Sequence, residues 1–315
     1  MIFERRTFLK AIAATSVFLM AVPASAFDVK RVTIRENGLV GRLHFVPGAR
    51  ARTAVIMLNG SDGGIPSATD ADDLAAAGHT VLALAYIKSW NGQPEGVPAT
   101  LNEIPLEYFF RAVDWLRAQP QADRPRIILM GQSRGAELAL LLASLRKDIA
   151  GVIAFSPSSR VWNGVTPPGA RSNQARAAWT LNGKPVPYQI SIANPALPMR
   201  QWFERARTMD AARIRVEDIQ ASVLLVSSKA DGVWPSAAYA DEVAARLANR
   251  RRGRQVRNIQ FEDASHLLMG TGPGITSLEI PGTTLKFNFG GTVEGNTRAR
   301  WEAWQAAKRF LLEIR

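Results

Sequence analysis

Short apolar runs alternate with amphipathic segments along most of the chain. Nearly continuous apolar runs bounded by turn residues are typical of strands buried on both faces of a sheet. The pattern predicts strands over residues 29–35, 39–46, 53–58, 81–86, 126–130, 152–155, 223–226 and 256–261. Apolar positions at helical spacing predict helices over residues 70–77, 106–116, 137–145 and 237–247, and a closing helix around residues 301–311. Strands separated by helices predict an α/β fold with a mostly parallel central sheet covered on both faces.

Two stretches break this alternation. Residues 156–220 carry scattered aromatic residues, including Trp162, Trp179 and Trp202, and residues 267–295 follow the last predicted strand. A long irregular segment inside a compact domain is usually functional, and loops after parallel strands gather where ligands bind. We therefore expect residues 156–220 to be a lid-like insertion whose tryptophans line an apolar pocket. The alternative is a surface excursion that only buries its own aromatic residues.

The composition narrows the chemistry. The 315 residues include no cysteine, which excludes disulfide scaffolds, cysteine zinc sites, a cysteine nucleophile and a lipoprotein anchor. The sequence has three histidines, His44, His79 and His266, and any histidine-dependent chemistry must use one of them.

The charge balance is basic. The net charge is +12, from 39 Lys and Arg against 27 Asp and Glu. Such a balance fits an anionic partner or serves general solubility. The basic residues are spread along the chain except for one cluster, which consists of Arg250, Arg251, Arg252, Arg254 and Arg257. The sequence shows no zinc-finger spacing, aromatic RNA-binding signature or heptad repeat, so we expect no nucleic-acid partner.

Residues 1–26 have the pattern of an export signal. Arg5 and Arg6 stand in a charged opening, residues 11–22 form an apolar run, and Ala24 and Ala26 form a small-residue cleavage site. The Arg-Arg-x-Phe-Leu-Lys sequence resembles the twin-arginine signal, which carries folded proteins across the bacterial inner membrane. The apolar run has 12 residues, whereas a membrane-spanning helix needs about 20. We expect recognition by export machinery, cleavage after Ala26, no stable membrane span, and a periplasmic or secreted single domain over residues 27–315. A plain amino-terminal helix is the alternative.

A Gly-x-Ser-x-Gly motif lies between a predicted strand and a predicted helix. Its residues are Gly131, Gln132, Ser133, Arg134 and Gly135. The bare pattern is common, but this context is that of a nucleophile elbow. Small residues on both sides allow a tight turn, and the following helix points its N-terminus at a developing oxyanion. Ser133 is therefore the predicted nucleophile, and a structural turn serine is the alternative.

A serine hydroxyl is a poor nucleophile without a base. His266 follows the last predicted strand, where proteins of this architecture carry the base in a Ser…Asp…His order. His44 lies inside a predicted strand and His79 directly precedes one, so both fit packing or capping roles. His266 is the predicted base.

The base in turn needs an acid that orients it. Asp231 follows a predicted strand and falls between Ser133 and His266 in the sequence. Glu262 and Asp263 are too close in sequence to His266 to come from a separate strand. Asp231 is therefore the predicted acid.

Two backbone N–H groups should form an oxyanion hole. One is expected from Arg134, which follows the nucleophile. The other is expected from Ser61, in the glycine-rich loop after the strand over residues 53–58, with Gly60 and Asp62 as neighbouring alternatives. This loop has neither the P-loop lysine nor the full G-x-G-x-x-G spacing, so we expect no nucleotide cofactor. We also expect no metal.

Several of these segments together resemble one family. It is the C-terminal domain of acyl-CoA thioester hydrolases and bile acid-CoA:amino acid N-acyltransferases, close to the dienelactone-hydrolase branch. The segments are LNGSDGG, LAAAGHTVLALAY, LEYFFRAVDWL, GQSRGAELALLLAS, SSKADGVWPS and ASH. The resemblance implies an α/β-hydrolase fold and a nucleophile–Asp–His triad, whose roles fall on Ser133, Asp231 and His266. Some members transfer the acyl group to an amino acid from a cysteine, whereas serine favours water as the acceptor.

The resemblance and the export signal point to different substrates. The family suggests an acyl-CoA thioesterase, whereas export suggests an ester or thioester found outside the cytoplasm. Both substrates pass through the same tetrahedral oxyanion, so the triad does not separate them. The sequence predicts a serine hydrolase that acts on small-molecule acyl esters or thioesters. An exported carboxylesterase or dienelactone-hydrolase-like enzyme is the alternative, and an acyltransferase or a non-catalytic binding module are further ones.

Overall fold

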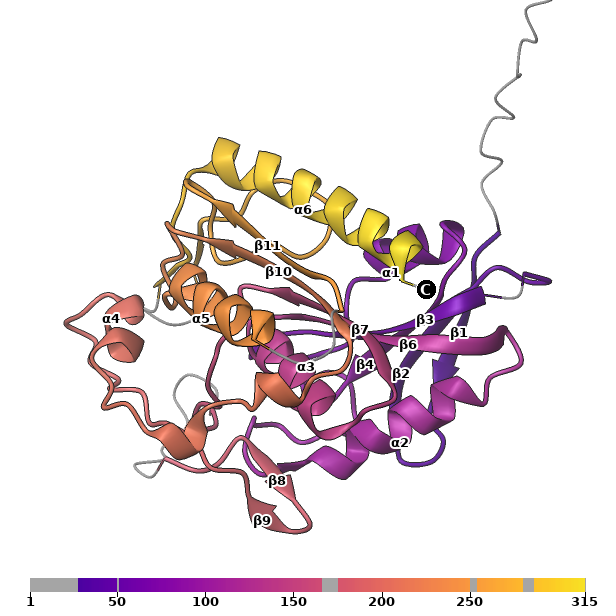
Figure 1. Ribbon diagram of the computed structural model, residues 1–315, viewed down its shortest axis with the longest axis horizontal. Helices are drawn as coiled ribbons and strands as arrows, with labels where there is room; N and C mark the ends of the chain where they lie inside the picture. The colour runs from indigo at the N-terminus through magenta and orange to yellow at the C-terminus, as the bar shows by residue number, and fades with distance from the viewer. Residues whose placement is uncertain (1–27, 50, 166–174, 250–253, 280–285, 315) are drawn as a thin grey trace, which may run out of the picture.

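The computed structural model describes residues 28–49, 51–165, 175–249, 254–279 and 286–314. The predicted export signal and its cleavage site lie outside the described residues, as do Arg250, Arg251 and Arg252 of the basic cluster. The described chain confirms the predicted α/β fold. An eight-stranded sheet lies between two layers of helices (Figure 1).

The sheet is mostly parallel, as expected from its apolar strands. In spatial order its strands are β1 (Lys30–Ile34), β2 (Val40–Phe45), β4 (Thr80–Ala85), β3 (Ala51–Leu58), β6 (Ala122–Gln132), β7 (Ile149–Phe155), β10 (Ser222–Ser228) and β11 (Val256–Phe261). The first two neighbouring pairs are antiparallel, and every later pair is parallel. The carboxyl ends of β3, β6, β7, β10 and β11 therefore meet at one edge of the sheet, where loops can assemble a site.

Helices cover both faces of this sheet (Figure 1). One face carries α1 (Ala68–Ala76) and α6 (Val293–Glu313), and the other carries α2 (Leu106–Arg117), α3 (Arg134–Leu145) and α5 (Ser236–Ala248). Side chains of β3 alternate between the two cores. Ile56 and Leu58 pack on the α2, α3 and α5 side, whereas Val55 and Met57 pack on the α1 and α6 side. Burial of each such side chain contributes about 1.5–3 kcal/mol, which explains the continuous apolar runs in the sequence.

The two irregular stretches contain short elements of their own. Residues 156–220 include β8 (Trp179–Leu181), β9 (Lys184–Pro185), α4 (Met199–Glu204) and two single turns of 3₁₀ helix, at Asp210–Ala212 and Val216–Asp218. The strands β8 and β9 form a small sheet with β5 (Ile104–Pro105). The second stretch includes a hairpin of β12 (Ser277–Glu279) and β13 (Lys286–Asn288).

The tryptophans of the insertion correct one expectation. Trp162 is 1% exposed and Trp179 is 0% exposed, so protein encloses both rings. Trp162 Nε1 donates to Ser158 Oγ at 2.9 Å, and Trp179 Nε1 donates to Glu137 Oε1 at 2.8 Å. These two side chains pack the insertion onto the domain instead of lining an open pocket. Trp202 is half-buried, and its Nε1 donates to the Asn194 carbonyl at 2.7 Å.

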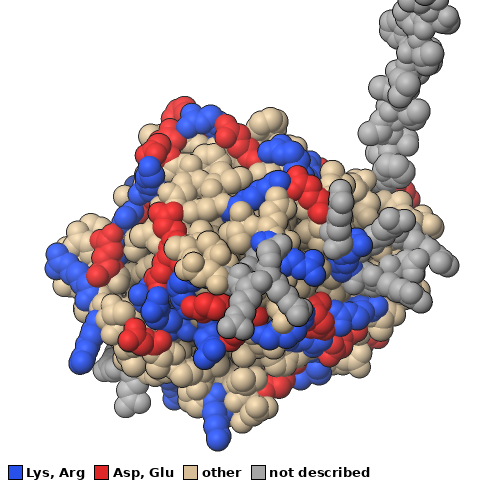
Figure 2. Space-filling model, viewed as in Figure 1, with Lys and Arg blue, Asp and Glu red and all other residues tan. Residues whose placement is uncertain are grey.

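On the face seen in Figure 2, Lys and Arg are interspersed with Asp and Glu, so this face carries no large patch of one charge. Many of these charges are paired: Arg146 contacts Asp114 and Asp148, and Arg257 of the basic cluster contacts Glu313 at 2.6 Å. Within the described residues, none of the helices has the length and apolar character that a membrane crossing requires.

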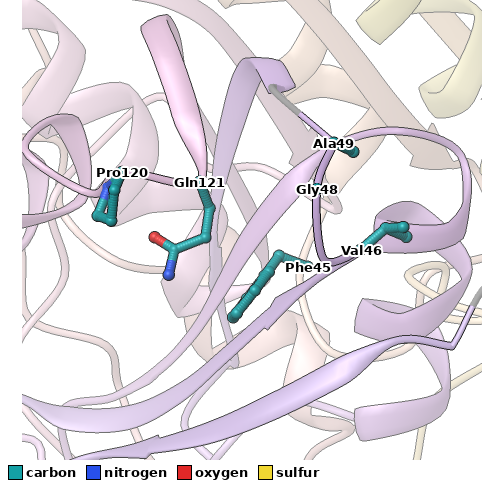
Figure 3. A pocket seen from close by; sticks show the side chains of 6 residues that line it. All are labelled: Phe45, Val46, Gly48, Ala49, Pro120 and Gln121. Carbon is teal, nitrogen blue, oxygen red and sulfur yellow. The ribbon is translucent and has the colours of Figure 1, made fainter.

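A cavity of about 200 Å³ lies at the amino-terminal edge of the parallel strands (Figure 3). Phe45, Val46, Gly48 and Ala49 line one side, and Pro120 and Gln121 line the other. Because Pro120 and Gln121 precede β6 whereas Ser133 follows it, this cavity is at the opposite edge from the predicted nucleophile.

Candidate active site

Ser133 occupies the turn between β6 and α3, as the elbow motif predicts. Its backbone has φ 57° and ψ −118°, a region that residues with a side chain rarely adopt. The Ser133 N–H donates to the Phe155 carbonyl at 2.9 Å, which ties the turn to the end of β7. The Ser133 side chain makes no capping hydrogen bond to α3. The Ser133 hydroxyl is therefore not used to cap α3.

Two glycines allow this turn because the backbone passes too close for a side chain. A Cβ on Gly131 would lie 2.2 Å from the Gly135 carbonyl oxygen. A Cβ on Gly135 would lie 2.5 Å from the Leu58 carbonyl oxygen and 2.4 Å from that of Asn59. The first contact closes the elbow, and the second brings α3 against the end of β3. Steric contact with the backbone therefore requires glycine at both positions of the motif.

His266 and Asp231 meet as predicted, from the loops that follow β11 and β10. His266 Nδ1 lies 2.8 Å from Asp231 Oδ2, and both side chains are buried. The second carboxylate oxygen, Oδ1, accepts from the N–H groups of Val233 at 2.8 Å and Trp234 at 3.2 Å. These hydrogen bonds fix the carboxylate, which in turn orients the imidazole with Nδ1 as the donor.

The backbone of His266 is attached to the elbow. The Gln132 side chain donates from Nε2 to the His266 carbonyl at 2.8 Å and accepts from the N–H groups of Leu268 and Met269. Ser156 Oγ donates to the same His266 carbonyl at 2.6 Å. The structure thus brings the histidine loop to the residue next to Ser133. Sequence reasoning missed Gln132 and Ser156, because no local pattern reveals a contact across more than a hundred residues.

The outer nitrogen of His266, Nε2, is buried and has no hydrogen-bond partner within the described residues. In particular, the Ser133 hydroxyl is not hydrogen-bonded to it. Catalytic hydrogen bonds are often long without substrate and tighten in the complex, so an unpartnered Nε2 is compatible with the role of a base.

An aromatic wall supports the imidazole. The Trp234 and His266 rings lie 5.5 Å apart, edge to face, and Trp234 Nε1 donates to the Ser156 carbonyl at 3.2 Å. Trp162 and Tyr239 pack with Trp234 and with the half-buried Phe203 of α4. The insertion therefore contacts the site from the side of His266, through this cluster.

The loop after β3 lies directly against Ser133. A Cβ on Gly60 would approach the Ser133 Cβ to 3.1 Å, so only glycine allows this contact without a shift. Tyr86 fixes the loop by donating from its hydroxyl to the carbonyls of Asn59 at 2.6 Å and Gly60 at 3.0 Å. Ser61, the predicted oxyanion donor, is the next residue and is half-buried. The role of the Ser61 N–H as an oxyanion donor stays a prediction.

Asp62 brings a carboxylate to the same place. A Cβ on Gly60 would lie 3.0 Å from Asp62 Oδ1 and 3.1 Å from the Ser133 Cβ. The side chains of Asp62 and Ser133 therefore both flank Gly60. The side chain reaches solvent, yet the protein around it is close enough for desolvation to raise the pKa of Asp62. Hydrogen bonding to backbone groups and the charge of His266 oppose this increase.

The side chain of Arg134, whose backbone is the other predicted oxyanion donor, forms a buried ion pair. Arg134 Nη1 lies 2.8 Å from Glu137 Oε2, and Nη2 donates to the carbonyls of Trp162 at 2.9 Å and Asn163 at 3.1 Å. Burial raises the pKa of Glu137 to about 7, against the attraction of Arg134 and the hydrogen bond from Trp179. Burial also lowers the pKa of Arg134. The pair links the first turn of α3 to the insertion.

The other titratable residues weighed from the sequence have structural partners. His44 is fully buried, and its Nδ1 lies 2.7 Å from Asp72 Oδ1. His79 is hydrogen-bonded to Thr53, and burial lowers its pKa to about 4.

The two acids next to His266 form ion pairs elsewhere. Glu262 pairs with Lys229 at 2.6 Å, and Asp263 pairs with Arg298 at 2.7 Å. Across the described ranges, no three His, Asp or Glu side chains converge as a metal site would require.

Comparison with known families gives a consistent result. Residues 104–314, more than half of the chain, match the family described as BAAT / Acyl-CoA thioester hydrolase C terminal. The chain belongs to this family. The predicted Ser133, Asp231 and His266 all fall within the matched residues.

Two curated relatives illustrate the range of the family. Acyl-coenzyme A thioesterase 1 of Rattus norvegicus is 28% identical over 294 residues, which cover 90% of this chain and 64% of that protein. Acyl-coenzyme A amino acid N-acyltransferase 1 of Mus musculus is 26% identical over 299 residues, with the same coverage of 90% and 64%. The chain thus spans slightly less than two thirds of the length of these relatives.

Solved structures agree on the fold. A puromycin-hydrolyzing peptidase of Mycobacterium tuberculosis superposes with a TM-score of 0.58 at 15% identity and covers 94% of this chain and 41% of that one. A thermophilic esterase of Thermogutta terrifontis gives a TM-score of 0.50 at 17% identity, with 93% and 95% covered. The fold is the α/β-hydrolase fold, as the sequence resemblance implies.

Proposed function

We propose that this protein is a serine hydrolase that cleaves an acyl ester or thioester through Ser133, His266 and Asp231. The observation that carries the proposal is the His266–Asp231 hydrogen bond of 2.8 Å, which leaves His266 Nε2 unpartnered within the described residues, while Gln132 of the elbow holds the His266 backbone carbonyl. The membership of a family that includes acyl-CoA thioesterases supports the same class of reaction.

In this mechanism, His266 Nε2 removes the proton from the Ser133 hydroxyl while Oγ attacks the acyl carbon. The resulting oxyanion accepts hydrogen bonds from the N–H groups of Arg134 and Ser61, at the N-terminus of α3. His266 then gives its proton to the leaving alcohol or thiol, and an acyl-Ser133 ester remains. Water attacks this ester with His266 again as base, the bond between the acyl carbon and Oγ breaks to release the carboxylic acid, and His266 returns the proton to Ser133 Oγ. Asp231 stabilises the imidazolium in both halves of the reaction.

The substrate is a small molecule with an ester or thioester bond, and the finer choice depends on location. We propose that the chain is exported by its twin-arginine signal and acts in the periplasm or outside the cell, where esters are the more available substrates. A cytoplasmic acyl-CoA thioesterase is the second candidate, favoured by the curated relatives. No cofactor or metal is needed for either reaction.

Ser133→Ala tests the mechanism. We expect kcat/KM to fall at least about a thousandfold, because loss of a nucleophile removes the covalent route. Fluorophosphonate labelling, which requires an activated serine, should disappear as well. The assays compare aryl acetates with acyl-CoAs of the same acyl group, with and without added glycine.

Ser144→Ala is the matched control. Ser144 lies in α3, the helix that follows Ser133, and is buried, and its hydroxyl donates to the Leu141 carbonyl at 2.7 Å. This variant should keep full labelling and near wild-type rates. Retention of more than about a tenth of the activity by Ser133→Ala would refute the assignment, and glycine conjugates among the products would favour an acyltransferase.

A further inference from the structure

Three aromatic side chains form a row that the mechanism above does not use. The Trp90 and Phe287 rings lie 5.4 Å apart, and the Phe287 and Phe289 rings are stacked 6.4 Å apart with planes inclined by 9°. Trp90 is 41% exposed, and Phe287 and Phe289 are half-buried. None of the three belongs to a hydrophobic core of the described chain. We call these residues the aromatic row.

One end of the row is attached to the oxyanion loop. Trp90 follows β4 in a tight loop in which the Ser89 N–H donates to the Gln93 carbonyl at 2.7 Å. The Gly64 N–H donates to the Ile87 carbonyl at 2.9 Å, and a Cβ on Gly63 would lie 2.3 Å from the Lys88 carbonyl oxygen. Trp90 is therefore presented by a loop that packs on Gly63 and Gly64, at the end of the loop after β3.

The other end is attached to the base. The Phe289 carbonyl accepts from the N–H of His266 at 2.8 Å and from that of Gly232 at 3.0 Å. A Cβ on Gly232 would lie 2.9 Å from the Phe289 carbonyl carbon, so the two segments touch. Phe289 is thus fixed between the loops that carry Asp231 and His266.

The sheet order shows what the row spans. Trp90 follows β4, whereas Phe289 is bonded to the loops after β10 and β11. Between β4 and β10 lie β3, β6 and β7, and Ser133 follows β6. The ring contact between Trp90 and Phe287 therefore joins loops from both sides of the nucleophile, across the edge of the sheet where Ser133 lies.

We propose that the aromatic row is the subsite for a flat apolar group of the substrate, such as an aryl ring. Aromatic faces bind flat rings by burying large apolar areas in defined geometry, and ligand sites combine such surfaces with a few polar groups. This assignment rests on the proposed hydrolase function. The flat group belongs either to the acyl part or to the leaving group, and the experiment separates these two.

Three esters test the row: methyl phenylacetate, with the ring in the acyl part; phenyl acetate, with the ring in the leaving group; and ethyl acetate, with no ring. For each ester, kcat/KM of a variant is divided by that of the wild type, which cancels intrinsic reactivity. Trp90→Ala and Phe287→Ala should each lower the ratio about tenfold for at least one aryl ester and change ethyl acetate less than twofold. Trp90→Phe should recover most of the loss.

Trp301→Ala is the matched control, because Trp301 is 64% exposed on α6, outside the row. It should leave all three ratios near one. Equal losses for all three esters, or no selective loss for either aryl ester, would overturn the proposal.

A binding measurement tests the aromatic row independently of catalysis by Ser133. Methyl phenylacetate and phenyl acetate are titrated calorimetrically into Ser133→Ala and into Ser133→Ala/Trp90→Ala, neither of which turns the ester over through Ser133. A dissociation constant about tenfold weaker in the double variant for either ester supports the row, and equal constants for both overturn it. If the wild type hydrolyses no ester or thioester and is not labelled by the fluorophosphonate probe, the proposed function is wrong. The titration still shows whether the aromatic row binds a flat apolar group.

Discussion

Ser133 holds its side chain in place through a backbone conformation with a positive φ of 57°. Such a conformation costs about 1–3 kcal/mol and persists only where the surroundings enforce it. Here the bond from the Ser133 N–H to Phe155 and the close passage of Gly131 and Gly135 enforce it. Because alanine keeps the same Cβ, Ser133→Ala should leave the elbow and the fold intact, so a loss of activity in that variant reports on chemistry.

Asp62 is the second residue whose chemistry follows from its position. A negative charge near Ser133 repels anionic substrates, and the repulsion is largest where protein limits screening. Asp62→Asn should therefore raise kcat/KM for an acyl-CoA, relative to the neutral N-acetylcysteamine thioester of the same acyl group, by about two- to fivefold at low salt. The two substrates share the acyl chemistry, so their ratio isolates the charge.

Glu302→Gln is the control for this charge, since it removes a carboxylate that is exposed on α6. It should leave the ratio unchanged. The gain in Asp62→Asn should shrink as salt is added, because screening weakens the repulsion. A ratio that stays at the wild-type value in Asp62→Asn at low salt would show that Asp62 does not face the bound substrate.

At the scale of elements, the buried Arg134–Glu137 pair predicts a pH dependence of stability. Burial raises the pKa of Glu137 from an ordinary value near 4.5 to about 7, so the folded state holds this proton more tightly than the unfolded chain. The stabilisation by the bound proton is present below pH 4.5 and is lost as pH rises toward 7. Between pH 4.5 and 7, the free energy of unfolding of the wild type should therefore fall by up to about 3 kcal/mol more than that of Glu137→Gln.

Urea unfolding of the wild type and of Glu137→Gln at pH 4.5, 6 and 8 measures this pH dependence. The two proteins share all other titrating groups, whose contributions cancel in the difference between their free energies of unfolding. Asp114→Asn serves as the control. It removes an exposed carboxylate that pairs with Arg146, which should change stability by less than about 1 kcal/mol. Parallel curves for the wild type and Glu137→Gln would show that Glu137 does not hold a proton in the fold.

The same elements show why the sequence predicts some parts of the molecule and not others. The strands of the sheet are fixed by local apolar runs, and the elbow by its flanking small residues, so both were predictable. Asp231 and His266 follow from chain order, since each comes after a parallel strand. The interior positions of Trp162 and Trp179 were not predictable, because they depend on partners far away in the sequence. Trp179 donates to Glu137 of α3, and Trp162 packs with Trp234 and Tyr239.

Contacts across the site were equally hidden from the sequence. Gln132 appears in the motif only as its variable position, yet its amide holds the His266 loop. The aromatic row joins residues almost two hundred positions apart, and the periodicity of apolar residues along the chain does not predict such a long-range contact.

At the scale of the whole molecule, the sheet order explains how one chain assembles the site. Ser133, Asp231 and His266 follow β6, β10 and β11, whose carboxyl ends share an edge, so folding of the sheet itself brings the three loops together. The His266–Asp231 bond and the Gln132 contact then depend on the complete sheet. A chain that reaches its destination already folded carries this site ready-made, which is what twin-arginine export would provide.

That route yields a prediction for the precursor. Replacing Arg5 and Arg6 with lysine should leave the uncleaved protein in the cytoplasm of a bacterial host, because the twin arginine is what the folded-protein export route recognises. Cell fractionation measures the distribution, and amino-terminal sequencing of the exported protein should begin at Phe27. The paired substitution Arg205→Lys and Arg207→Lys, at exposed positions of the mature domain, controls for the change of residue type and should export normally. Unchanged export of the Arg5 and Arg6 variant would instead assign the protein to the ordinary secretory route, in which the chain crosses unfolded and the active site forms only on the far side.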